Sequence, residues 1–448
     1  MIPRTVLLLA VVGLLHRAPA PDVQGPAVAA LLPADGSLDV DPTTTELVVT
    51  FDRDMDRNAG WSVCGGGVTF PKVDSIAWRD ARTLVLRVRL APDTRYVLPL
   101  NCEGSAQRLC DTRGRRLAPT SWSFATSDPT PADPAQRARN EASLEALREL
   151  VATEYSYRDR VVEDWDASFA AARESILAAA SDASFARRIG RLLGAARDPH
   201  LWIGPREQLA PTFERTAPSL FAPESIERRI GELRKASDAV WYGRIRDGER
   251  TVGYLLVRTL ESSAQAALAV AQNALDEFAR DCDAMVLDLR PNGGGNELLA
   301  LPIAAWFVTG TQVYAGCVKR NPESGAWDVR DERRIVGNGA GRRFDGPVAV
   351  LIGPRCLSSC EAFVLMMRQA ERAVLVGSRT GGSSGNPQPH VLPNGVTVWL
   401  PSWRATDADG ECFEGVGIAP DIEVRATASD FERGDPVLEA ALAALRER

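Results

Sequence analysis

The stretch that decides the fold is Ala284-Met-Val-Leu-Asp-Leu-Arg290, which runs directly into Pro291-Asn-Gly-Gly-Gly295. Its first part has the apolar run of a β-strand, and its second part has the glycines of a sharp turn. Glycine allows backbone conformations that other residues resist, and a glycine loop presents bare N–H groups. Gly293, Gly294 and Gly295 are therefore candidate donors of an oxyanion hole, and a tight strand-to-helix turn is the alternative interpretation.

Strands and helices alternate on either side of this stretch, which is typical of an α/β domain, and we assign that domain to residues 201–448. The expected elements are strands at Val252–Val257, Met285–Leu289 and Val348–Ile352 and helices at Ser263–Arg280 and Glu361–Ala370. Residues 138–200 are rich in alanine, arginine, glutamate and leucine, with apolar residues at helical spacing, which predicts a small helical bundle. A proline-rich polar linker at residues 128–137 precedes it.

The N-terminal region, residues 25–127, consists of short β-rich runs separated by turn residues. This pattern predicts an all-β sandwich of about immunoglobulin size. The expected strands are Thr45–Phe51, Leu84–Leu90, Tyr96–Leu100 and Ser121–Thr126. Together with Pro33-Ala-Asp-Gly36 and Asp54-Met-Asp56, these runs resemble the bacterial Ig-like domains that exported proteins carry as accessory modules.

The length of 448 residues exceeds what one hydrophobic core usually organises, which agrees with a multidomain chain. The formal net charge is −7 and no long lysine or arginine run occurs, so nucleic acid is not an expected partner. Residues 1–20 have the charged start, apolar run and Ala18-Pro-Ala20 cleavage site of a signal peptide. We expect an exported mature chain with no membrane span, and Pro21 after the cleavage site leaves an uncleaved N-terminal anchor as the alternative.

Eight cysteines, at positions 64, 102, 110, 282, 317, 356, 360 and 412, allow disulfides in an exported chain, and their pairing is open. Cys356 and Cys360 either tie down the loop between them or stay as free buried thiols. No Cys/His cluster has zinc-ligand spacing, and the chain has only three histidines. Neither a metal nor another cofactor is expected.

A second strand-to-helix junction contains Ser358. The strand Pro347–Gly353 leads through Pro354-Arg-Cys-Leu to Ser358-Ser-Cys-Glu361 and an apolar helix, which places Ser358 at a helix N-terminus. The unpaired N–H groups and the positive end of the helix dipole favour a developing oxyanion there. Ser-x-x-Glu is also the spacing of a capping box, so a helix cap is the alternative to a nucleophile.

Six motifs follow one another along this region: Gly253-Tyr-Leu-Leu-Val257, Asp288-Leu-Arg-Pro-Asn-Gly-Gly-Gly295, Ser358-Ser-Cys-Glu361, Val376-Gly-Ser-Arg-Thr-Gly-Gly382, Leu392-Pro-Asn-Gly395 and Glu414-Gly-Val-Gly-Ile-Ala-Pro-Asp421. Their order and approximate spacing resemble those of the tail-specific, or C-terminal processing, peptidase family. Upstream, Asp164-Trp-Asp166 and Arg197-Asp-Pro-His200 are similar to elements of its tricorn-like branch. The resemblance implies a catalytic domain of the ClpP/crotonase-like kind that hydrolyses peptide bonds.

The resemblance also implies roles for particular residues. The lysine that the processing branch uses is absent, because Ser383 stands at its position. The tricorn-like branch instead implies that Ser358 attacks the substrate, that His200 takes and returns the proton, and that Glu414 orients the imidazole. The implied oxyanion donors are a backbone N–H of the Gly293–Gly295 loop and that of Ser359.

One residue departs from the tricorn-like pattern. In that pattern the residue before the histidine is a serine whose hydroxyl bridges the glutamate to the base, whereas here it is Pro199, which has no donor. Asp198, Ser383 and Ser384 are candidates for the missing link. A looser triad and a retired site are the alternatives.

The sequence therefore predicts an exported serine peptidase with a protein or peptide substrate. Two alternatives stay open. One is a catalytically retired protein of the same fold that binds a peptide or an apolar ligand, and the other is an esterase that uses the same triad. Nothing in the sequence indicates a partner for the Ig-like domain.

Overall fold

The structure is a computed structural model, and it describes residues 25–448 apart from 66–68, 103–107, 128–129, 131, 206–208, 214, 216, 219, 340, 428–429 and 432. The chain forms two compact units, Met1–Pro131 and Ala132–Arg448. The predicted signal peptide lies outside the described residues, as does part of the predicted linker. Within the described ranges, no helix is both long enough and apolar enough to cross a bilayer.

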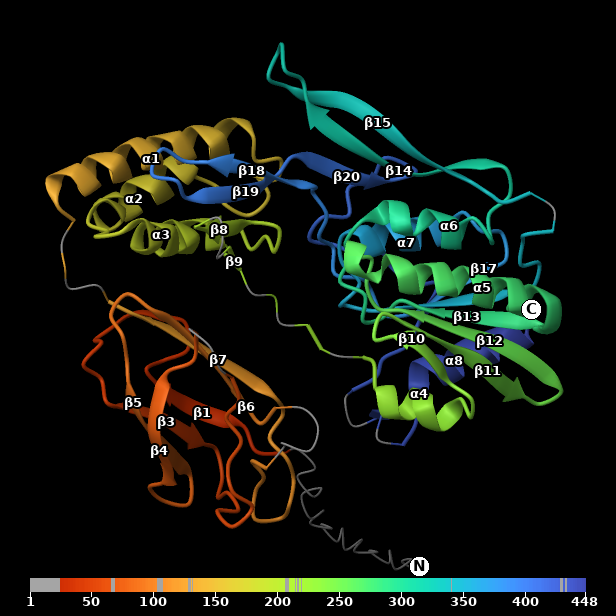
Figure 1. The fold of residues 1–448 in the computed structure, drawn as a ribbon, viewed down its shortest axis with the longest axis horizontal. Coiled ribbons are helices and arrows are strands. Elements are labelled where there is room, and N and C mark those ends of the chain that lie inside the picture. The colour runs from red at the N-terminus through yellow and green to blue at the C-terminus, as the bar shows by residue number, and fades with distance from the viewer. Residues whose placement is uncertain are drawn as a thin grey trace, which may run out of the picture. The chain divides into compact units, whose positions relative to one another are not determined.

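The N-terminal unit is built from two β-sheets, with strand orders β1-β3-β5-β4 and β2-β7-β6 (Figure 1). Alternate side chains of β3 and β6 are buried, and the core contains residues from both sheets, among them Phe51, Leu86 and Trp122. The predicted sandwich strands are confirmed to within one residue at each end. The strands are β1 Val28–Leu32, β2 Ser37–Val40, β3 Glu46–Phe51, β4 Lys72–Trp78, β5 Thr83–Arg89, β6 Arg95–Leu100 and β7 Thr120–Thr126.

The cysteines are mostly free thiols. Cys64 and Cys102 form a disulfide in the N-terminal unit. The other six cysteines are unpaired, and Cys356 and Cys360 are fully buried. The two sulfurs share a backbone acceptor, because Cys356 Sγ lies 3.1 Å and Cys360 Sγ lies 3.8 Å from the carbonyl oxygen of Leu289. Cys356 and Cys360 are therefore free buried thiols, which is one of the two interpretations of the sequence.

The centre of the C-terminal unit is a seven-stranded sheet with the order β10-β11-β12-β13-β16-β17-β21. Strands from β12 to β21 are parallel, and β10 and β11 extend the sheet antiparallel. The strands are β10 Arg234–Ser237, β11 Val240–Asp247, β12 Arg250–Val257, β13 Ala284–Asp288, β16 Val348–Ile352, β17 Ala373–Gly377 and β21 Ile422–Glu423. The predicted α/β alternation is therefore present over this part of the chain.

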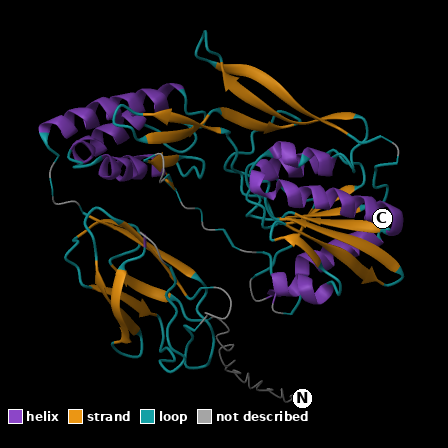
Figure 2. Cartoon of the chain, in the orientation of Figure 1, coloured by secondary structure: helices purple, strands orange, loops and turns teal. Residues whose placement is uncertain are grey.

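Helices cover both faces of this sheet (Figures 1 and 2). Met285 and Leu287 of β13 pack in one core with α5, α6 and α7, whereas Ala284 and Val286 pack in another with α4 and α8. Burial on both faces explains why β13 reads as a continuous apolar run. The helices are α4 Pro223–Arg229, α5 Gln265–Asp281, α6 Leu301–Ala304, α7 Ser359–Arg368 and α8 Pro436–Arg446.

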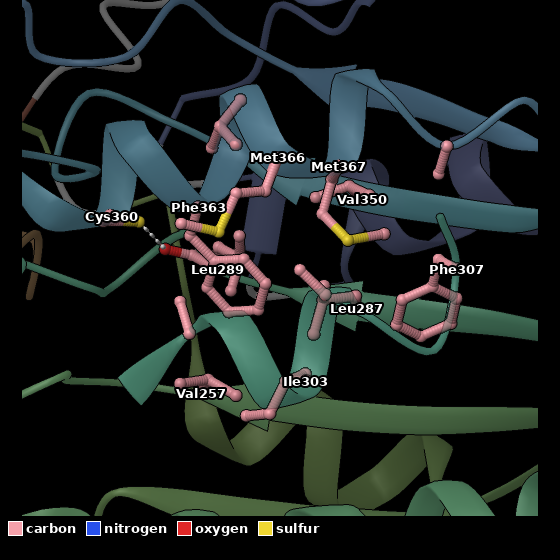
Figure 3. Close-up of a cluster of buried hydrophobic side chains, with 14 of the residues drawn as sticks. Val257, Leu287, Leu289, Ile303, Phe307, Val350, Cys360, Phe363, Met366 and Met367 are labelled. Carbon is pink, nitrogen blue, oxygen red and sulfur yellow. Dashed lines mark hydrogen bonds between the residues drawn. The ribbon is translucent and has the colours of Figure 1, made fainter. Parts of the chain in front are cut away.

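Helix α7, which follows Ser358, lies deep in the first of these cores. Figure 3 shows Phe363, Met366 and Met367 among side chains of β12, β13 and β16. Residues 360–367 are all buried, so apolar side chains surround the helix instead of forming one stripe. A helix held on all sides gives its first residue a fixed position.

Helices α1, α2 and α3 pack beside a small sheet with the order β18-β19-β8-β9. Pro134 is the first residue of α1, where its missing N–H costs nothing, and Asp133 caps the helix, so α1 begins inside the segment that the sequence assigned to the linker. A third sheet, β15-β14-β20, extends from the α/β region. The elements are α1 Pro134–Thr153, α2 Trp165–Leu177, α3 Asp182–Gly194, β8 Trp202–Gly204, β9 Ala210–Pro211, β14 Thr311–Arg320, β15 Trp327–Val336, β18 Pro387–Val391, β19 Thr397–Pro401 and β20 Trp403–Asp407.

Candidate active site

Ser358 stands at the junction between strand β16 and helix α7. Its backbone has φ 56° and ψ −123°, a conformation that side-chain-bearing residues rarely adopt. The glycine loop packs directly against it, since a methyl carbon placed on Gly294 would lie 3.0 Å from Ser358 Cβ. The two junctions that the sequence singled out therefore meet at one place.

The Glu361 carboxylate holds the backbone around Ser358. Its oxygens accept the N–H groups of Ser358 at 3.3 Å, Gly382 at 2.7 Å and Ser383 at 2.9 Å, and the hydroxyl of Thr380 at 2.5 Å. Burial raises the pKa of Glu361 to about 7, although these hydrogen bonds oppose the shift. Glu361 thus caps the Ser358 backbone, as the capping-box alternative requires, and it also fixes the neighbouring loop.

His200 lies in the loop between α3 and β8 and is 7% exposed. Its Nδ1 and the hydroxyl oxygen of Ser383 are 2.6 Å apart and share a hydrogen bond. Burial lowers the pKa of His200, and the nearby Asp198 opposes that shift. The imidazole is therefore neutral near neutral pH, which is the protonation state that a general base needs.

His200 and Ser358 are connected through Ser383. The Ser358 N–H donates to the Ser383 carbonyl at 2.7 Å, while the Ser383 hydroxyl contacts the imidazole. Among the described residues no hydrogen bond joins the Ser358 hydroxyl to His200. His200 and Ser358 thus share a neighbour, and a direct hydrogen bond between their side chains is not formed in this structure.

Glu414 is buried beside the same loop but does not hydrogen-bond to His200. One of its oxygens accepts the Ser384 N–H at 2.6 Å. Burial raises the pKa of Glu414, and repulsion from Asp198 raises it further. Asp198 is itself fully buried, and it accepts the His200 backbone N–H at 2.8 Å and the Tyr155 hydroxyl at 2.9 Å. Asp198 therefore lies next to His200, and Glu414 lies near enough to Asp198 for the two acids to interact.

One N–H group of the glycine loop already donates a hydrogen bond. Gly294 donates to the side-chain oxygen of Asn292 at 2.8 Å, and Asn292 in turn donates to the carbonyl of Val257 at 3.1 Å. Within the described part of the chain, the N–H groups of Gly293, Gly295 and Ser359 have no acceptor. Of the predicted oxyanion donors, these three are available to a ligand and Gly294 is occupied.

Sequence reasoning missed the ion pair that anchors the start of this loop. Arg290 is buried and forms ion pairs with Asp288 at 2.6 Å and with Asp435 at 2.8 Å. Asp435 also caps helix α8, 145 positions along the chain, so no local pattern could have revealed the contact. Among the described residues no cluster of His, Cys, Asp and Glu has the arrangement of a metal site.

Solved structures resemble about two thirds of the chain. A candidate peptidase from Parabacteroides merdae ATCC 43184 has 24% sequence identity and a TM-score of 0.59 over 68% of this chain and 96% of its own. Mature CPAF in complex with lactacystin has 12% identity and a TM-score of 0.52 over 70% of this chain and 98% of its own. At these identities the likeness shows the fold alone.

Sequence comparisons name the family. The model of peptidase family S41 matches residues 251–424, and the model of the bacterial Ig-like domain matches residues 22–126. The chain therefore contains a peptidase family S41 domain and, before it, a bacterial Ig-like domain.

Curated relatives match over shorter stretches. Carboxyl-terminal-processing peptidase 1, chloroplastic, of Arabidopsis thaliana is 24% identical over 179 residues, which is 40% of this chain and 35% of the relative. Peptidase 3 of the same name and organism is 26% identical over 165 residues, 37% of this chain and 30% of the relative. The chain thus matches about a third of the length of these relatives.

Proposed function

We propose that this chain is an exported serine peptidase that hydrolyses peptide bonds through an acyl-enzyme at Ser358, with His200 as general base and Glu414 as orienting carboxylate. The observation that carries the proposal is that the glycine loop packs against Ser358 at the N-terminus of α7, while Ser383 connects that serine to the buried imidazole of His200. Because these residues come from different parts of the chain, a helix cap alone does not account for their meeting.

The proposed reaction begins with proton transfer from Ser358 to His200. Nδ1 of His200 is engaged by Ser383, so Nε2 is the nitrogen that takes the Ser358 proton. The serine oxygen then bonds to the substrate carbonyl carbon, and the N–H groups of Gly293, Gly295 and Ser359 stabilise the oxyanion. His200 returns the proton to the leaving amine as the C–N bond breaks, and water releases the acyl group by the same steps.

In this proposal Glu414 acts on the imidazole through the loop that contacts it. It is held by the Ser384 N–H, one residue from the serine that contacts His200, and it repels Asp198. The raised pKa of Glu414 favours its protonated form, so in this proposal Glu414 orients the base by holding the segment that contacts His200 and not by its charge. The use of a histidine and a glutamate without a lysine supports a mechanism of the tricorn-like kind.

Two wider features agree with the proposal. The mainly parallel sheet with helices on both faces, together with α1 to α3, is what we expect of a ClpP/crotonase-like peptidase unit with a helical bundle. The Cys64–Cys102 disulfide and the bacterial Ig-like domain support export, because disulfides persist in oxidising compartments.

A second candidate function is peptide binding without hydrolysis on the same fold. It is favoured by the lack of a hydrogen bond between the Ser358 hydroxyl and His200 among the described residues. Hydrogen bonds between catalytic groups are often long in the absence of substrate, so this geometry alone does not remove the enzyme function.

A fluorophosphonate probe, which reacts with activated serines, separates the two functions. We expect the purified protein to be labelled, Ser358→Ala to be unlabelled, and His200→Ala to label at least about 100-fold more slowly. His390→Ala is the matched control, because His390 lies in strand β18 and has no role in the proposed reaction. A folded wild-type protein that stays unlabelled would favour peptide binding.

A further inference from the structure

Ser383 has an unusual set of contacts. It is 1% exposed, and each of its three polar groups bonds to a different part of the site. Its N–H donates to Glu361 at 2.9 Å, its carbonyl accepts the Ser358 N–H at 2.7 Å, and its hydroxyl lies 2.6 Å from Nδ1 of His200. One buried residue therefore couples helix α7, the nucleophile and the base.

We propose that Ser383 is the positioning residue of the base: its hydroxyl accepts the Nδ1–H of His200 and so fixes the tautomer in which Nε2 is unprotonated and free. This inference rests on the serine peptidase function proposed above. The ring of His200 has no other hydrogen bond among the described residues, and the contact with Asp198 uses only the backbone N–H. Without the Ser383 hydroxyl, no hydrogen bond among the described residues would define the orientation of the ring.

The polar groups of Asp198 and Ser384 that lie near His200 already have other hydrogen-bond partners. The oxygens of Asp198 accept the His200 backbone N–H and the Tyr155 hydroxyl, and the Ser384 N–H bonds to Glu414. Ser383 is the residue among the three candidate links that contacts the imidazole. It takes the place that Pro199, with no side-chain donor or acceptor, cannot fill.

Loss of this hydroxyl has a defined consequence. In Ser383→Ala the buried Nδ1 loses its partner, so the ring is free to turn and to exchange tautomers. Because the positions of reacting groups matter at the scale of 1 Å, we expect the rate of fluorophosphonate labelling to fall by about 10- to 100-fold. The matched control is Ser378→Ala, which removes another hydroxyl from the same segment, one that has no partner among the described residues. We expect Ser378→Ala to label at the wild-type rate.

A second readout does not depend on activity. The chain has only three histidines, so 15N-histidine labelling gives an NMR spectrum in which the signals of His200 are identified by their loss in His200→Ala. We expect wild-type His200 to carry its proton on Nδ1, and Ser383→Ala to show averaged nitrogen shifts.

The outcomes are distinguishable. An unprotonated Nδ1 in the wild type, or a Ser383→Ala variant with unchanged nitrogen shifts and labelling rate, would overturn the assignment. If Ser383→Ala does not fold, the wild-type spectrum alone decides whether Nδ1 of His200 carries the proton. If the wild type is not labelled at all, the proposed peptidase function fails, and the Ser383 assignment stands or falls on the Nδ1 signal.

Discussion

Gly294→Ala tests the close packing of the glycine loop against the nucleophile. A methyl carbon on Gly294 would lie 2.7 Å from the carbonyl oxygen of Leu357, 3.0 Å from Ser358 Cβ and 3.1 Å from Ser359 N. The first of these contacts is with a backbone oxygen, which cannot rotate away as the end of a side chain can. The residue also has φ +103°, a conformation that costs a side-chain-bearing residue about 1–3 kcal/mol. Overpacking adds about 1–3 kcal/mol, so we expect a loss of about 2–6 kcal/mol in the free energy of unfolding.

The assay is urea unfolding, together with the rate of fluorophosphonate labelling under native conditions. If the loop moves to relieve the clash, stability is partly recovered but the donors shift, and labelling slows by about 100-fold. Gly293→Ala is the control for stability, because a methyl there meets nothing within 4 Å. A Gly294→Ala protein within about 0.5 kcal/mol of the wild type that also labels at the wild-type rate would refute the packing argument.

Three further predictions follow from buried charges. Arg290→Met leaves Asp288 and Asp435 buried without their partner, so we expect a loss of about 3–5 kcal/mol in urea unfolding, and a loss below about 1 kcal/mol would contradict it. The pKa of Glu361, about 7, lies above the pKa of a glutamate in the unfolded chain, so the native state holds an extra proton between about pH 4.5 and 7. The contribution of Glu361 to the free energy of unfolding therefore falls as pH rises through this range. In Glu361→Gln that fall, on the order of 3 kcal/mol, should be absent from unfolding curves measured across this range. Because the pKa of His200 is lowered, the acid limb of the labelling rate should have its midpoint below about pH 6.5, and a midpoint above it would count against His200 as the base.

Much of the fold could be predicted from local sequence. The strand Val348–Ile352 was predicted with its observed bounds, and the predicted helix at Glu361–Ala370 overlaps the observed Ser359–Arg368. These elements are short apolar runs bounded by turn residues, and such patterns depend only on neighbours in sequence. The meeting of Ser358 with the glycine loop was also predictable, because parallel strands place the loops at their carboxyl ends along one edge of the sheet.

The contacts that complete the site could not be predicted in this way. The Ser383 hydroxyl and the His200 ring are 183 positions apart, and Arg290 and Asp435 are 145 positions apart. The sheet formed by β18, β19, β8 and β9 likewise joins segments from two distant parts of the chain. A serine or an aspartate in a loop carries no local sign of its partner, because many such residues only cap or solvate the backbone.

The identity of residue 383 and the need for His200 are physically linked. Position 383 lies beside the nucleophile whichever side chain it carries, because its backbone groups bond to Ser358 and Glu361. A serine hydroxyl is too weak a base to activate another serine near neutral pH, so the base has to come from a different segment. In the proposed mechanism His200 supplies the base from the loop after α3, and the same serine hydroxyl then serves as the partner of Nδ1. Because the Ser383 hydroxyl acts only through His200, we expect Ser383→Ala to cause almost no further loss of labelling rate when His200 is already alanine.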